Sequence, residues 1–105
     1  MAKTKFVLTG TPTFKAKVAI PIPGGSPEIV EFTFRRRTKE AYLEWAKDMA
    51  EKDDVDLILE VASGWELEDP FDADSLEKLT QNYIGSGRAV LETYINQQTN
   101  AKLGN

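Results

Sequence analysis

The side chains that most often do chemistry in proteins are missing from this chain. Its 105 residues include no histidine and no cysteine, which excludes the common hydrolytic triads, thiol nucleophiles and the usual zinc ligand sets. Carboxylates, lysines, tyrosines and hydroxyls remain, and their spacing matches no catalytic motif. We therefore expect a protein that is not an enzyme and that needs no cofactor.

One acidic run has the residue types of a calcium site. It consists of Asp69, Asp72, Asp74 and Glu77, and carboxylates are among the ligands that calcium prefers. The run lacks both the Asp-x-Asp-x-Asp-Gly order and the distant bidentate glutamate of an EF-hand. Helix capping and loop positions explain these acids better, so we predict no metal site.

Two glycine pairs have the flexibility to approach a phosphate group. They are Gly24 with Gly25, and Gly85 with Gly87. Neither pair continues as Gly-x-Gly-x-x-Gly or as a Gly-Lys-Ser/Thr loop. We interpret both pairs as turn glycines.

The run Arg35-Arg36-Arg37 is the natural candidate for a nucleic-acid contact. On an extended strand these side chains alternate between the two faces, so they do not form one basic patch. The remainder of the chain is acidic and repels phosphate. We therefore predict no nucleic-acid partner.

Charge is distributed unevenly along the chain. Residues 1–39 have a net charge of +6, residues 40–77 a net charge of -12, and residues 78–105 a net charge of +2. These blocks could pair within the fold, or an acidic helical face could steer a partner over about one Debye length, roughly 8 Å in physiological salt. A solvated face with local pairing is the simpler interpretation.

The segment from Pro12 to Thr38 predicts a β-hairpin, with strands at about 14–20 and 28–36. The first strand places four apolar residues on one face: Phe14, Ala16, Val18 and Ile20. The second does the same with Val30, Phe32 and Phe34. A third short strand at Lys5 to Leu8 is also expected, because an isolated two-stranded hairpin is only marginally stable in water.

The turn of this hairpin runs from Pro21 to Pro27 and is too long for a two-residue connection. Its prolines cannot donate to a strand ladder, so we expect a protruding, mobile loop. If the hairpin has a functional surface, the first candidates for partner binding are Pro21, Pro23, Gly24 and Gly25.

Helical periodicity follows the hairpin, with helices expected at about 39–52, 54–63, 75–83 and 87–100. Thr38 suits the N-cap of the first helix, and Asp74 with Glu77 suits a capping box for the third. The second helix is apolar nearly all round and should lie centrally. Leu76, Leu79 and Tyr83 form the expected inner stripe of the third helix.

These elements predict one α+β domain over residues 1–105, in which an antiparallel hairpin packs on three to four helices. Trp65 and Phe71 lie between the second and third helices, where they could anchor a partner or fill the core beneath a loop. No apolar run approaches the ~20 residues that cross a bilayer. We expect neither a standard export signal nor a membrane partner.

The order of several short segments resembles the tail assembly chaperones of tailed bacteriophages and prophages. The resemblance begins with Pro12-Thr13-Phe14, Val18 to Pro23 with Gly24-Gly25, Val30 to Phe34, and Arg36-Arg37-Thr38. It continues with Gly64-Trp65, Phe71, the helix from Leu76 to Tyr83, Tyr94, and Gly104-Asn105. It rests on order and spacing over most of the chain and not on one diagnostic motif.

This resemblance implies an assembly factor in the cytoplasm of the bacterial host. Such a protein binds the tape measure protein, keeps it soluble, helps to recruit major tail protein subunits, and leaves before the tail is complete. The family offers no catalytic motif to carry over, and homo-oligomerisation stays open. Two alternatives remain: a structural tail component retained in the virion, and a small acidic bacterial protein-binding regulatory module.

Overall fold

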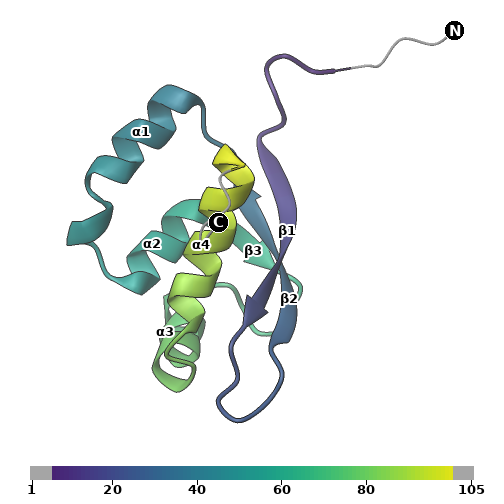
Figure 1. The fold of residues 1–105 in the computed structure, drawn as a ribbon, viewed down its shortest axis with the longest axis vertical. Helices are drawn as coiled ribbons and strands as arrows, with labels where there is room; N and C mark the ends of the chain where they lie inside the picture. Colours follow the sequence, from purple (N-terminus) through teal and green to yellow (C-terminus); the bar gives the residue numbers. More distant parts are fainter. Residues whose placement is uncertain (1–5, 101–105) are drawn as a thin grey trace, which may run out of the picture.

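The computed structural model describes residues 6–100, which form a three-stranded antiparallel sheet with helices on one face (Figure 1). The sheet has the order β1-β2-β3, and the elements follow the chain as β1 (Thr13–Ile20), β2 (Glu28–Arg35), α1 (Lys39–Lys47), the 3₁₀ turn η1 (Met49–Glu51), α2 (Asp54–Val61), β3 (Ala62–Trp65), α3 (Ala73–Asn82) and α4 (Ser86–Thr99). This architecture confirms the α+β prediction.

The alternating pattern of the hairpin is confirmed residue by residue. β1 pairs with β2 so that Phe14 lies opposite Phe34, and Val18 lies opposite Val30. Val18, Phe32 and Phe34 are fully buried on the helix side, whereas the intervening lysines of β1 are exposed on the other face. Because side chains alternate across a strand, one apolar set is enough to orient the whole hairpin.

The prediction of a third strand at Lys5 to Leu8 is wrong for the part that can be judged. Lys5 lies outside the described residues, and Phe6 to Leu8 form no strand. The third strand is instead β3, which pairs antiparallel with β2 and places Trp65 opposite Phe32. A register shift between Thr33 and Phe34 accommodates the pairing.

β3 also corrects the predicted end of the second helix. We expected helix through residue 63, but α2 ends at Val61, and Ala62 has extended dihedral angles of φ -125° and ψ 151°. Pairing with β2 satisfies the backbone groups that a longer helix would have used. Glu66 N–H extends the ladder by donating to the Glu31 carbonyl at 3.0 Å.

The other helix ends follow local capping. Thr38 caps α1 as predicted, because its Oγ1 accepts a hydrogen bond from Ala41 N–H at 3.1 Å. The predicted single helix at 39–52 is wrong, since α1 ends at Lys47 and a 3₁₀ turn follows Asp48. The cap of α3 is Asp72 and not Asp74: its Oδ1 accepts from Ser75 N–H at 2.9 Å.

The core lies between the sheet and the helices, with α2 at its centre. α2 contacts α3, α4, β2 and β3, while α4 lies across β1. The buried apolar residues are Val18, Ile20, Val30, Phe32, Phe34, Trp45, Leu57, Ile58, Val61, Ala62, Leu76, Val90 and Tyr94. The central position predicted for the second helix is therefore confirmed.

Among residues 6–100, none of the helices is both long and apolar enough to cross a bilayer.

Candidate functional site

A groove about 480 Å³ in volume lies between α3 and the segment that connects β3 to it. We call it the Trp65 groove, and its lining residues are Trp65, Leu67, Asp69, Ser75, Lys78, Leu79, Asn82 and Tyr83. The strand β3 contributes the floor through Trp65, and the connection and α3 contribute the walls. The groove therefore joins residues that lie up to 18 positions apart in the chain.

Trp65 forms the fixed floor of this groove. Its ring makes edge contacts with Phe32 at a centroid distance of 5.6 Å and with Phe71 at 5.2 Å. Its Nε1 donates a hydrogen bond to the Asp69 carbonyl at 2.9 Å. Because two aromatic neighbours and the Asp69 carbonyl hold the indole, the ring has a defined orientation at the groove.

Several large apolar side chains reach the solvent at the groove and beside it. Leu67 is 40 % exposed and Tyr83 is 37 % exposed. Ile84, the next residue after Tyr83, is 87 % exposed. Tyr83 thus departs from the predicted inner stripe, because it is the C-cap of α3 with φ -128° and ψ 90° and no longer follows the helical period. An apolar surface of this kind is typical of a docking site.

The chain segment that contributes most of the groove is strongly acidic, although the charged residues that line the groove itself are Asp69 and Lys78. Residues 66–78 contain six carboxylates, Glu66, Glu68, Asp69, Asp72, Asp74 and Glu77, against the single base Lys78. Within residues 6–100, none of these six carboxylates belongs to an ion pair. Glu66 and Asp72 accept backbone hydrogen bonds, and Glu77 lines a different concavity beside Asp53 and Asp54. Glu68, Asp69 and Asp74 therefore remain as exposed carboxylates that a partner could approach.

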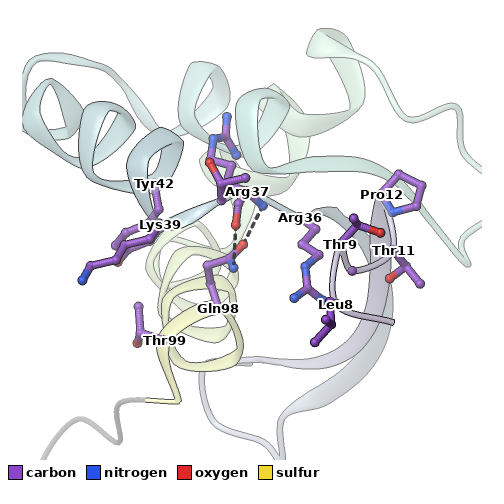
Figure 2. A pocket seen from close by; sticks show the side chains of 12 residues that line it. Leu8, Thr9, Thr11, Pro12, Arg36, Arg37, Lys39, Tyr42, Gln98 and Thr99 are labelled. Carbon is purple, nitrogen blue, oxygen red and sulfur yellow. Dashed lines mark hydrogen bonds between the residues drawn. The ribbon is translucent and has the colours of Figure 1, made fainter. Parts of the chain in front are cut away.

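A second concavity, the Arg36 pocket, has a volume of about 620 Å³ and is shown in Figure 2. It lies between the arm at residues 8–12, the connection from β2 to α1, and the end of α4. Among the described residues, Arg36 and Lys39 line it and no carboxylate does. The Arg36 side chain lies against Gly10, where an added Cβ would come within 2.6 Å of Nε. The pocket suits an acidic group, but it lacks the aromatic floor of the Trp65 groove.

Arg37 helps to close the base of this pocket through its backbone. The Gln98 side chain accepts a hydrogen bond from Arg37 N–H at 2.9 Å and donates one to the Arg37 carbonyl at 3.1 Å (Figure 2). The Arg37 guanidinium instead lies over the rings of Trp45 and Tyr94, 5.4 and 5.8 Å from their centroids. This residue is thus part of the packing between β2, α1 and α4.

The loop from Pro21 to Pro27 does not contribute to the Trp65 groove. Pro21, Pro23, Gly24 and Gly25 are all exposed. Gly24 adopts φ +78°, and Gly25 N–H donates to the Ile22 carbonyl at 3.0 Å, so the loop contains a tight turn. A positive φ favours glycine at position 24. The loop therefore stays a separate candidate surface.

Of the residues singled out from the sequence, Trp65 lines the groove, and Phe71 contacts Trp65 without lining the groove. Phe71 is half-buried and contacts both Trp65 and Phe32. Leu67 was not predicted as a surface residue, and Leu79 and Tyr83 were predicted only for the core. Helical spacing brought out the last two, but it could not show that the chain between β3 and α3 leaves them partly open.

Metal binding finds no support in the part of the chain that the structure describes. There, no group of three or more histidine, cysteine or acidic residues is arranged to hold an ion. Asp72 caps α3, as noted above, which agrees with the helix-cap interpretation of the acidic run.

Comparison with known proteins gives one match. A family described as phage tail assembly chaperone matches residues 1–105, the whole of the sequence. Searches of curated proteins and of solved structures found nothing similar.

Proposed function

The chain belongs to the phage tail assembly chaperone family, and we propose that it is a non-enzymatic chaperone that binds the tape measure protein. In this role it keeps the tape measure protein soluble in the cytoplasm of the bacterial host and helps to recruit major tail protein subunits around it. The observation that carries the proposal, beside the family match, is the Trp65 groove with its exposed apolar lining.

A chaperone for an elongated, helical client needs apolar surface that it can cover and uncover reversibly. The groove offers a rigid aromatic floor with partly exposed leucine and tyrosine side chains at its walls. Helix-in-groove binding uses such a surface, because an amphipathic helix buries one apolar stripe while its polar face stays in water. The charged surroundings keep the empty groove soluble.

Co-expression tests the proposal. The tape measure protein is produced alone, with the wild-type chain, and with two variants of it, and its soluble fraction is measured. Wild type should raise the soluble fraction severalfold. Phe32→Asp should fail, because Phe32 is fully buried and a charge there disrupts the core. Ile29→Ser, which changes an exposed residue of β2 on the sheet face away from the helices, should act like wild type. Equal solubility with and without the wild-type chain would refute the assignment of the client.

A structural tail component is the second candidate, favoured by one feature of the sheet. Within residues 6–100, β1 pairs only with β2, so its other edge is open to a neighbour's strand. Lys15 and Lys17 are exposed along that strand, and lysine is a residue that proteins use to discourage edge pairing. Mass spectrometry of purified virions separates the two candidates: the chaperone should be absent from the particle, and abundant recovery would favour the structural role.

A further inference from the structure

We propose that the Trp65 groove binds a cationic amphipathic helix of its partner. The apolar stripe of that helix fills the groove, and its lysine and arginine side chains lie over the acidic surroundings. This inference rests on the proposed chaperone function and specifies the chemistry of the client segment.

The shape of the groove favours a helix as the occupant. One wall is α3 itself, through Lys78, Leu79 and Asn82, and the opposite wall is the connection that carries Leu67. An amphipathic helix presents apolar side chains at i, i+3, i+4 and i+7, which span about 10 Å along its axis. Such a row can pack along α3 as the ridge of one helix packs into the groove beside another.

The groove is organised before any partner binds. The Trp65 ring is held by Phe32, Phe71 and the Asp69 carbonyl. The start of the opposite wall is held as well, because Glu31 N–H donates to Glu66 Oε2 at 2.7 Å. A preformed site loses little conformational freedom on binding, which favours affinity from a small apolar contact.

The charge around the groove selects the sign of the partner. The segment 66–78 has a net charge of -5, from six acids and Lys78. Asp72 is occupied as the cap of α3, and Glu66 as an acceptor of a backbone hydrogen bond. Asp69 lines the groove together with Lys78, and Glu68 and Asp74 are exposed close to it in the chain. These three carboxylates are outside any ion pair of the described chain, whereas Glu77 lines a separate concavity with Asp53 and Asp54. Glu68, Asp69 and Asp74 attract a cationic helix and repel an anionic one.

A second copy of this chain is the competing occupant. Phe6, Val7 and Leu8 are 77 %, 59 % and 89 % exposed, and they form an apolar arm that could enter a neighbour's groove. The arm is short and shows no helical turn in the described residues, so it matches the groove less well than an amphipathic helix does.

The test uses two fluorescein-labelled synthetic helical peptides of 18 residues with the same leucine stripe. One peptide has lysine at the polar positions and the other has glutamate. Fluorescence anisotropy with the full chain should give at least about tenfold tighter binding for the lysine peptide, and raising NaCl from 50 to 500 mM should weaken that binding by about tenfold. Equal affinity for the two peptides would overturn the proposal.

Matched variants show whether binding occurs at the groove. Leu67→Ser should weaken binding of the lysine peptide by about tenfold. Leu43→Ser, at an exposed apolar position of α1, should leave that affinity within about twofold of the wild-type value. Glu68→Lys should weaken binding more than Glu51→Lys, which makes the same change of net charge in η1. Equal effects within either pair would mean diffuse electrostatic binding and refute the site.

Sedimentation velocity examines the competing occupant. Any self-association of the wild-type chain should be unchanged in Leu67→Ser. A concentration-dependent dimer that this variant abolishes would assign the groove to a second copy. The peptide experiments are independent of the co-expression test. A chain that solubilises the tape measure protein but does not distinguish the two peptides retains the proposed function and loses only the cationic helix.

Discussion

Three consecutive arginines take three different places in this protein. Arg35 ends β2 and is exposed, and Arg36 lies in the pocket beside the N-terminal arm. Arg37 is half-buried, donates from Nη1 to Tyr94 Oη at 3.1 Å and from Nη2 to the Glu60 carbonyl at 2.9 Å, and stacks on two aromatic rings. The alternation predicted from the sequence separated these side chains, but it did not reveal that the Arg37 side chain contacts three helices, α1, α2 and α4.

Replacing Arg37 by lysine should lower the free energy of unfolding by about 1–3 kcal/mol. Lysine keeps the positive charge but lacks the planar guanidinium. That group donates hydrogen bonds to both Tyr94 and Glu60 and lies over the Trp45 ring. Urea unfolding measures the change. The control is Arg36→Lys, at an exposed position without an ion pair in the described chain, which should change stability by less than about 0.5 kcal/mol. Equal losses in the two variants would contradict the stacking role.

Tyr94 should make the protein sensitive to alkaline pH. Burial raises the pKa of Tyr94 above its ordinary value of 10.0, and the hydrogen bond from Arg37 opposes that rise. The folded state therefore binds this proton more tightly than the unfolded state does. The stability that follows from the raised pKa is complete below pH 10 and decreases as the pH rises above it.

The variant Tyr94→Phe isolates this effect. At pH 7 it should be about 1–2 kcal/mol less stable than wild type, because the hydroxyl bonds both Arg37 and Gln98. Above pH 10 wild type loses stability through Tyr94 and the variant does not, so the difference should shrink. Urea titrations between pH 7 and pH 11 measure it. A difference that stays constant over this range would show that Tyr94 has the same pKa in both states.

At the scale of elements, one glycine sets how closely α4 approaches α2. A Cβ on Gly87 would come within 2.5 Å of the Asp54 carboxylate and 3.0 Å of its Cβ. Alanine has the higher helix propensity, yet Gly87→Ala should destabilise the protein by about 1–3 kcal/mol, because the Asp54 carboxylate must turn away and the two Cβ atoms, 3.0 Å apart, must move apart. Thermal unfolding measures the loss. Gly64→Ala is the control: nothing lies within 4 Å of its Cβ position, so its Tm should not fall. A Tm for Gly87→Ala at or above that of wild type would refute the close approach.

Part of the fold follows from local sequence signals, and part forms only through tertiary contacts. The hairpin could be predicted because alternation at Phe14 to Ile20 and Val30 to Phe34 is a local signal. β3 could not, since Ala62 to Trp65 is short and contains a glycine, and it becomes a strand only through its pairing with β2. Capping at Asp72 was missed because Asp74 offered a competing signal two residues later.

The candidate site could be predicted from the sequence only in part, for the same reason. Trp65 and Phe71 could be singled out by residue type, but the groove also needs Leu67 and Tyr83, whose exposure depends on how the chain passes from β3 to α3. Partner surfaces form from tertiary neighbours, so sequence spacing alone does not assemble them. The family resemblance, in contrast, depends on order along the chain and was confirmed over residues 1–105.

For the whole molecule, the uneven charge allows two opposite effects on stability. Residues 40–77 have a net charge of -12. The described residues contain three ion pairs, and at least one side chain is strongly exposed in two of them, Lys47–Glu44 and Arg88–Glu92. We expect repulsion among the acids to exceed the few local attractions. Screening by salt should relieve that repulsion, since 0.5 M NaCl shortens the Debye length to about 4 Å.

We therefore expect the Tm to rise by about 4 °C between 10 and 500 mM NaCl, which corresponds to roughly 1 kcal/mol for a protein of this size. Chloride is used because sulfate would stabilise the protein by exclusion from its surface. Glu51→Lys, an exposed change within the acidic block, should have a higher Tm at low salt and a smaller rise. A Tm that falls with salt would show that attraction between the basic hairpin and the acidic helices dominates. The acids would then stabilise the fold and not be held available for a partner.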